Sequence, residues 1–219
     1  MTLESSKNLG GIGAILIIVA SLAFFVQPLF SFIGIVGIIL ILIALHGLAE
    51  VYQDRGIFNN ALIAFVAVIV GVAVTVVGLY YLFFTSAYIT DLLKVLYPGF
   101  NGDWTNLPNL TPNTNANPND LVPFIGPILS VLSGTWVFSI IASFFVWRSL
   151  KSVAAKSTVG MFATSGILML IGSILLIAFG LGAILMGIAI LLLAIAFFQL
   201  KQHGEPAPEF ATPSPPTNS

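Results

Sequence analysis

The amino-acid sequence predicts an all-α membrane protein, a bundle of six transmembrane helices with both chain ends in the cytoplasm. Residues 8–49 and 157–200 contain no charged side chain over 42 and 44 positions. A helix rises about 1.5 Å per residue, so each run is about twice as long as a bilayer core of roughly 30 Å is thick. Each run must therefore fold back on itself. The whole chain is 58% hydrophobic and only 7% charged, against about 25% charged in soluble domains.

The charge and cysteine content exclude several classes of function. The net charge is −1 and the seven basic residues are scattered, so the chain lacks the basic patch that nucleic-acid binding needs, and no nucleic acid is expected as a partner. Cysteine is absent, which excludes disulfides, thiolate metal ligands and cysteine nucleophiles. The expected partners are the lipid bilayer and other membrane proteins or a second copy of the chain.

Six apolar segments approach the length of about 20 residues that a spanning helix needs. A cytoplasmic N-terminus at residues 1–8 precedes them. Gln27 and Pro28 separate the first two segments, because proline lacks a backbone donor and disfavours helix in its predecessor. Gly180 and Gly182 separate the last two. The segments are residues 9–25, 29–48, 61–84, 121–147, 160–178 and 181–200.

A cleaved signal peptide is the alternative interpretation of the first segment. Lys7 precedes an apolar stretch, and Ser21 and Ala23 have the small side chains of a cleavage site. Phe24 and the residues after it continue the apolar run without a polar break, and a second apolar segment follows at once. A first transmembrane helix is therefore the prediction.

The distribution of basic residues predicts the orientation. With the N-terminus in the cytoplasm, six spans leave only Lys94 outside, as the positive-inside rule favours. In this arrangement residues 85–120 form an external loop. The basic residues on the cytoplasmic side are then Lys7, Arg55, Arg148, Lys151, Lys156 and Lys201.

Polar residues between the second and third segments indicate where these helices end and begin. Asn59 or Asn60 is expected to cap the third helix by accepting a hydrogen bond from a free amide. Gly56 is expected to close the second helix in a left-handed conformation.

The external loop has two predicted parts. Its first part is an amphipathic helix on the bilayer surface that ends at Pro98 and Gly99, since its apolar residues recur at helical spacing. Its second part, residues 101–119, is rich in asparagine and proline and favours turns and exposed coil. Asn109 begins an N-glycosylation triplet, although such triplets also arise by chance. The apolar residues of the amphipathic helix are Ile89, Leu92, Leu93 and Leu96.

The C-terminal tail, residues 201–219, contains five prolines and almost no apolar residues. This composition predicts a disordered cytoplasmic segment. An extended polyproline ligand at residues 206–216 is the alternative interpretation.

Four stretches resemble an uncharacterised archaeal family of integral membrane proteins of the domain-of-unknown-function 996 type. They are SKNLGGIG at residues 6–13, GIFNNAL at 56–62, the run at 148–166, and LAIAFF at 193–198. The resemblance implies a multi-pass membrane protein and carries no activity, cofactor or functional residue.

The first and last hairpins are also candidates for an internal repeat. Residues 13–22 align with 166–175, and residues 37–46 align with 187–196. The shared letters are mainly glycine, alanine, isoleucine and leucine, so chance similarity is the alternative.

His46, Glu50 and Asp54 form the best polar group in the sequence. They recur every four residues, which would stack them on one face of a helix as it leaves the membrane. Such a group could hold a metal ion or relay protons. The favoured interpretation is an interfacial histidine beside hydrated carboxylates, with no metal and no cofactor.

Five hydroxyl side chains are expected at membrane depth. They could line a narrow path for a solute. The favoured interpretation is helix packing, because small hydroxyl residues let helices approach and bond to neighbouring carbonyls. They are Thr75, Ser130, Ser133, Thr135 and Ser173.

The spans carry no ionisable group of the kind that coupled transporters use. No aspartate, glutamate, lysine or arginine lies deep in a predicted span, and no intramembrane protease motif is present. We therefore expect a structural or accessory component of the cell membrane without catalytic activity. An uncoupled channel or transporter for a neutral or lipid-like solute is the alternative.

Overall fold

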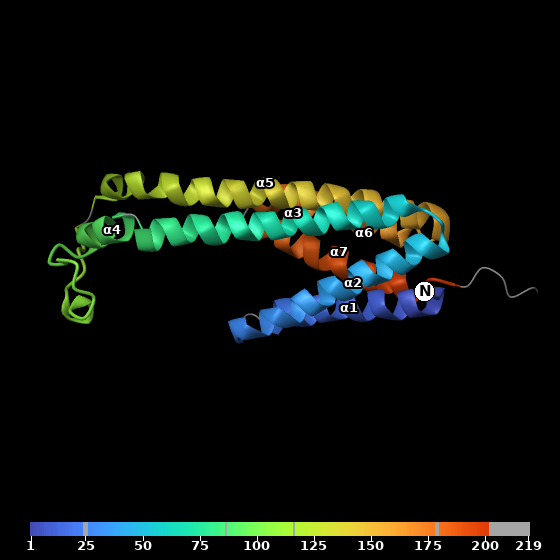
Figure 1. The fold of residues 1–219 in the computed structure, drawn as a ribbon. Helices are drawn as coiled ribbons and strands as arrows, with labels where there is room; N and C mark the ends of the chain where they lie inside the picture. The colour runs from blue at the N-terminus through green and yellow to red at the C-terminus, as the bar shows by residue number, and fades with distance from the viewer. Residues whose placement is uncertain (24–25, 86, 116, 178–179, 202–219) are drawn as a thin grey trace, which may run out of the picture.

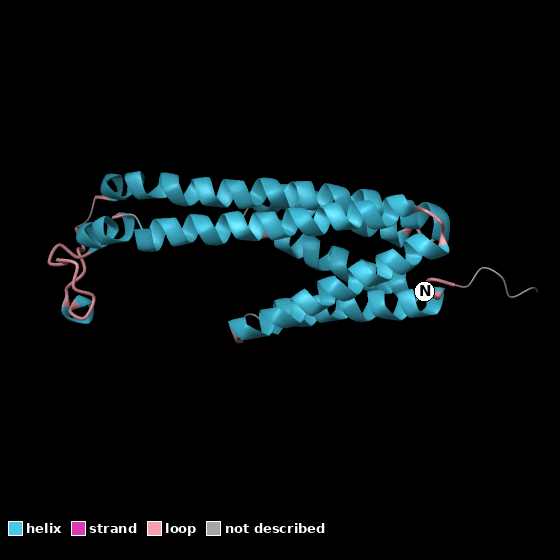
Figure 2. Cartoon of the chain, viewed as in Figure 1, coloured by secondary structure: helices cyan, strands magenta, loops and turns pink. Residues whose placement is uncertain are grey.

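A computed structural model describes residues 1–23, 26–85, 87–115, 117–177 and 180–201, and within these ranges it contains helices and no strand (Figure 2). The predicted all-α class is therefore confirmed. The predicted C-terminal tail lies outside the described residues except for Lys201. The α-helices are α1 (Leu3–Ala23), α2 (Ser31–Val51), α3 (Arg55–Tyr80), α4 (Tyr88–Leu96), α5 (Pro118–Ser157), α6 (Met161–Ile174) and α7 (Leu181–Phe198). Short helical turns cover Pro28–Phe30, Leu107–Asn109 and Leu175–Ile177, and a π-helical turn, Tyr81–Thr85, extends α3.

Five of these helices are long and apolar enough to cross a membrane, namely α1, α2, α3 with its extension, α5 and α7. The remaining predicted span, the fifth at residues 160–178, corresponds to α6 and the turn after it, an apolar helix over Met161–Ile177. Its 17 residues stand at the lower limit for crossing a bilayer. At the other extreme, the 40 residues of α5 extend for about 60 Å.

The turn between α2 and α3 differs from the prediction. Asp54, rather than Asn59 or Asn60, caps α3, because its Oδ1 accepts a hydrogen bond of 2.8 Å from the Gly56 amide. The helix therefore begins at Arg55, before both asparagines. Gly56 does not close α2, because it already belongs to α3, and the left-handed residue after α2 is Gln53, with a φ of 51°.

Apart from the short α4, the described α-helices form three antiparallel pairs, α1 with α2, α3 with α5, and α6 with α7 (Figure 1). The N-terminus, the α2–α3 turn and the end of α7 lie at one end of the bundle. We call this the terminal end. Helix α4 and the loop after it lie at the opposite end, the loop end. The α1–α2 pair meets the other helices near the terminal end and diverges from α3 and α5 toward the loop end (Figure 1).

Two glycines explain the close approach of α1 to α2. A Cβ atom on Gly13 would lie 2.7 Å from the Gly37 carbonyl oxygen, and one on Gly37 would lie 2.6 Å from the Gly13 carbonyl oxygen. Only residues without a side chain permit this distance between the two backbones. In the repeat alignment, Gly13 and Gly37 correspond to Gly166 and Gly187. Gly166 instead faces Trp147 on α5, and Gly187 faces open space, so the aligned glycines do not make equivalent contacts.

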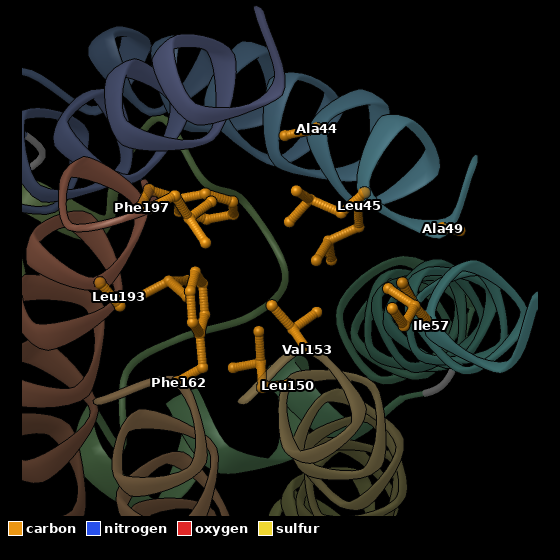
Figure 3. Packing of buried hydrophobic residues seen from close by; sticks show 13 residues of the cluster. Ala44, Leu45, Ala49, Ile57, Leu150, Val153, Phe162, Leu193 and Phe197 are labelled. Carbon is orange, nitrogen blue, oxygen red and sulfur yellow. The ribbon is translucent and has the colours of Figure 1, made fainter. Parts of the chain in front are cut away.

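The best-packed part of the bundle is a cluster at the terminal end (Figure 3). The rings of Phe162 and Phe197 meet edge to face there, with centroids 5.1 Å apart. Aromatic pairs in this geometry add stability beyond the area that they bury. This cluster joins α2, α3, α5, α6 and α7 at one end only. Its buried members are Ala44, Leu45, Leu48, Ala49, Ile57, Ala61, Leu150, Val153, Phe162, Leu193, Ala196, Phe197 and Leu200.

At the loop end, α4 is the short amphipathic helix that the sequence predicts. It is attached to α5, because the Tyr88 hydroxyl donates a hydrogen bond of 2.6 Å to the Phe124 carbonyl. The following loop folds back onto α4, where the Asn113 amide donates to the Leu96 carbonyl at 2.7 Å. Two hydrogen bonds from Thr105, first from its side chain and then from its backbone, lower the pKa of Asp103. The loop is therefore ordered by specific hydrogen bonds rather than being plain exposed coil.

Candidate functional site

An apolar cavity of about 240 Å³ lies between the hairpins, and six helices contribute to it. It exists because α1 and α2 diverge from α3 and α5 beyond the packed cluster. Small side chains on α3, at Ala61 and Ala64, also leave room. Its lining residues are Ile17, Ile38, Ile41, Leu42, Leu45, Ala61, Ala64, Phe65, Val68, Val146, Ser149, Leu150, Met169, Ile190 and Leu193.

The packed cluster closes this cavity toward the terminal end. Leu45, Ala61, Leu150 and Leu193 belong to both the cavity wall and the cluster. On α3, α5 and α7 the remaining cluster residues lie further toward the terminal end, as Phe197 does on α7, and on α2 Leu48 and Ala49 do so. The cavity is thus a blind apolar space and not a passage through the bundle.

Among the described residues of the cavity wall, Ser149 is the one with a polar side chain, and its hydroxyl is already bonded. The Ser149 Oγ donates a hydrogen bond of 2.7 Å to the Ile57 carbonyl on α3. A ligand in the cavity would meet an almost entirely hydrocarbon wall, which fits an apolar group such as part of an acyl chain. Water or an ion would gain no hydrogen bond to compensate for its dehydration.

The structure brings together two of the three residues in the predicted polar group. The His46 Nε2 atom lies 3.4 Å from a Glu50 oxygen, and both side chains are about half exposed. The other Glu50 oxygen lies 3.0 Å from the amino group of Met1. Asp54 does not join them, because α2 ends at Val51 and Asp54 caps the next helix. The interpretation that all three stack on one helix face is therefore wrong for Asp54.

The chemistry of this polar group is limited by its surroundings. The His46 and Phe58 rings pack edge to face, with centroids 4.6 Å apart. Both residues line a pocket of about 500 Å³ to which Glu50 and Arg55 also contribute. Across the part of the chain that the structure describes, no three histidine, cysteine, aspartate or glutamate side chains are placed to hold one metal ion. A histidine beside one carboxylate is an ordinary interfacial pair.

The five predicted hydroxyl residues do not share a path. Thr75 and Thr135 bond to each other across α3 and α5 at 2.5 Å, and each also bonds to a carbonyl in its own helix. Ser130 and Ser133 lie on the exposed face of α5. Ser173 is buried, and its carbonyl accepts a hydrogen bond from the indole of Trp136. None of the five lines the apolar cavity.

Two buried serines outside the predicted set of five hydroxyl residues connect helices. Ser149 links α5 to α3, and the Ser165 Oγ donates a hydrogen bond of 2.7 Å to the Ala189 carbonyl on α7. In the sequence, the burial of Ser149 is indicated by its position seven residues after the small residue Ala142. Residues at this spacing lie on the same face of a helix, and both are buried. The adjacent Arg148 and Lys151 concealed it, because they suggested that the helix had already left the membrane.

Asn109, the predicted glycosylation residue, is exposed at the loop end. Its side-chain amide donates a hydrogen bond of 3.3 Å to the Asn106 side chain. An exposed side chain on a turn is accessible to modification, and glycosylation of Asn109 stays a prediction.

Comparisons with known proteins give a family without an assigned activity. A family model described as "Protein of unknown function (DUF996)" matches residues 33–191, from the start of α2 into α7. The chain is also similar to the uncharacterised protein MJ1644 of Methanocaldococcus jannaschii. They are 27% identical over 200 residues, which cover 91% of this chain and 94% of the relative. No solved structure matches.

Proposed function

The chain belongs to the family of proteins of unknown function DUF996. We propose that it is a six-span protein of the cell membrane with both ends in the cytoplasm. The positions of the basic residues support this orientation. Lys7 and Lys201 line one pocket at the terminal end, and Arg55 follows the α2–α3 turn at that end. Lys94 lies on α4 at the loop end. The positive-inside rule then assigns the terminal end to the cytoplasm.

We further propose that the protein is a structural or accessory component without catalytic activity, which packs against another membrane protein or a second copy of itself. One observation carries this proposal. The hydroxyl groups at membrane depth bond to each other or to nearby carbonyls, or face outward, so the described part of the interior offers no polar route. The outer faces of α3 and α5, by contrast, expose long apolar stretches that include Val77 and Leu129.

Site-directed photo-crosslinking tests this accessory role. A photoreactive residue at Val77 or Leu129, which are 66% and 53% exposed, should give one protein adduct of defined mass in intact membranes. The same residue at Ile57, which is fully buried, serves as the control and should give no adduct. Purification in mild detergent should then recover the same companion. Adducts with lipid alone from every exposed position would contradict the accessory role.

The apolar cavity favours a second candidate function, the binding or movement of a lipid-like solute. Its volume of about 240 Å³ is below the roughly 300–1,000 Å³ of most ligand pockets, so it would accept part of an acyl chain. Ala64→Leu fills the cavity, whereas Ala73→Leu makes the same change on an exposed face of α3. Weaker binding of a fluorescent fatty acid by Ala64→Leu alone, at unchanged thermal stability, would favour this candidate. Equal binding by both variants would count against it.

A metal-dependent role is not proposed, and the polar group at the α2–α3 turn provides its test. The expectation is that the purified protein retains no specific metal. Stoichiometric zinc that is lost in His46→Ala would overturn this expectation.

A further inference from the structure

A pocket of about 680 Å³ at the terminal end is not used by either proposed function. It lies where both ends of the membrane domain meet the α5–α6 turn. Lys7 enters from α1 and Lys201 from the residues after α7, while residues 157–160 form the turn between them. Two lysines separated by 194 positions in the sequence therefore line one pocket.

The described lining of this pocket carries positive charge. Among the residues that the structure describes, no carboxylate lines it and no aspartate or glutamate is paired with Lys7 or Lys201. Two ammonium groups in one concave site attract an anion, because each provides three hydrogen-bond donors. The charge therefore favours an anionic ligand.

The α5–α6 turn adds backbone N–H donors, which attract an anion as the two lysines do. Helix α6 begins after Gly160, which has no side chain to cap the first amides. Thr158 is left-handed, with a φ of 61°, and its hydroxyl donates to the Ser157 carbonyl at 2.6 Å. That hydroxyl is occupied within the turn, and the Phe162 amide already donates to the Val159 carbonyl at 3.3 Å. The lysines and the remaining first amides of α6 are left as donors. These donors are suited to the oxygens of a phosphoryl group.

An apolar strip leads from the membrane to this pocket. On α7, exposed apolar side chains recur at helical spacing on one face, and the last of them, Phe198, also lines the pocket. A hydrocarbon chain lying on this strip would bring its headgroup to the two lysines. This geometry distinguishes a lipid from a soluble anion, which would have no use for the strip. The residues of the strip are Ile184, Ile188, Leu191, Ile195 and Phe198.

We propose that Lys7, Lys201 and the start of α6 bind the phosphoryl group of an anionic phospholipid, with an acyl chain along the outer face of α7. The site is independent of the accessory role and of the apolar cavity. Free inorganic phosphate shares the phosphoryl oxygens of the headgroup but lacks the acyl chain. Comparing the affinity for the phospholipid with the affinity for phosphate therefore shows whether the ligand is a lipid or a soluble anion.

The test uses the full chain in a neutral detergent at low ionic strength. Three probes are titrated separately: dioctanoyl phosphatidylglycerol, dioctanoyl phosphatidylcholine and inorganic phosphate, with bound lipid counted by native mass spectrometry and affinity taken from thermal shifts. The double variant Lys7→Gln with Lys201→Gln is compared with Lys94→Gln plus Lys151→Gln. The control removes the same charge from lysines outside the pocket. Melting without ligand shows whether each variant is folded.

Phosphatidylglycerol should bind more tightly than phosphatidylcholine. A membrane-surface lysine contributes about a fivefold affinity change toward an anionic lipid, so the pocket variant should lose about 25-fold and the control much less. Lysine-dependent binding of inorganic phosphate as tight as that of phosphatidylglycerol would support a phosphoryl site while assigning it to a soluble ligand. Equal affinity for both lipids, or the same loss in both double variants, would overturn the proposal.

Discussion

The close contact of α1 with α2 leads to a specific prediction for Gly13→Ala. In the structure, a methyl group at this position would lie 2.7 Å from the Gly37 carbonyl oxygen, 3.0 Å from Ile41 and 3.0 Å from Leu40. The nearest of these atoms belongs to the backbone of α2, so it cannot rotate away. The two helices must separate locally, and the substitution is expected to destabilise the fold.

The size of the effect follows from the distances. Ordinary van der Waals contact begins at 3.4 Å, so the carbonyl and the new methyl group must move apart by about 0.7 Å. Overpacking of this kind costs typically about 1–3 kcal/mol. The higher helix propensity of alanine offsets up to about 1 kcal/mol. We expect a net loss of about 1–2 kcal/mol, or a melting temperature lower by roughly 2–8 °C for a chain of this size.

Gly187→Ala is the matched control. Gly187 also lies within an apolar helix, but nothing is within 4 Å of the position that its Cβ would occupy. Its substitution should leave stability unchanged or raise it by up to about 1 kcal/mol. Thermal unfolding of both variants in the same detergent gives the comparison, and Gly37→Ala should behave like Gly13→Ala because its methyl group would meet the Gly13 carbonyl at 2.6 Å. Equal melting temperatures for Gly13→Ala and Gly187→Ala would refute the close-contact argument.

Ser149→Ala removes a buried hydrogen bond to α3 and should lower the free energy of unfolding by about 0.6–1.7 kcal/mol. Ser133→Ala, on an exposed face, should leave the thermal stability unchanged. Equal effects of the two substitutions would argue against the packing role of Ser149. Asp54→Ala removes the cap of α3 and should lower the free energy of unfolding by about 0.5–2 kcal/mol, measured by thermal unfolding. Asp54→Asn keeps a capping oxygen and should retain most of the stability. The same loss in both variants would contradict the capping geometry. The pKa of Asp103 is lowered from its ordinary 3.8, so its stabilising effect is complete above about pH 4 and is lost as the pH falls through the lower folded-state pKa. Thr105→Ala removes the side-chain hydrogen bond and should move that pKa toward 3.8 in a carbon-13 NMR titration of the carboxyl group, and an unchanged pKa would exclude the Thr105 hydroxyl as its main cause.

The sequence was sufficient to predict features that depend on neighbours along the chain. Long uncharged runs identify the apolar helices, because the preference of a segment for lipid is a sum over its own residues. The spacing of Ile89, Leu92 and Leu96 identifies α4, whose apolar face differs from its polar face. Gln27 and Pro28 lie between α1 and α2, and the left-handed Gly180 precedes α7, as their backbone preferences indicate.

The sequence alone does not determine which residue caps α3 at the α2–α3 turn, because several neighbouring residues are suited to that position. Asp54, Gly56, Asn59 and Asn60 are all residues that end or begin helices. Which of them acts depends on where α2 stops and how α3 packs against α5. The structure selects Asp54 and so removes a carboxylate from the group around His46.

What the sequence by itself determined is therefore the class of protein and the positions of its apolar helices, since hydropathy and helical spacing are properties of single segments. What only the tertiary structure decided is which side chains meet: the bonds of Ser149 and Ser165, the blind apolar cavity, and the pocket that Lys7 shares with Lys201. The physical reason lies in the solvent. A helix in water reveals its buried face through the contrast between apolar and polar residues, but a helix in lipid is apolar all round, so its inward face becomes visible only once its neighbours are in place.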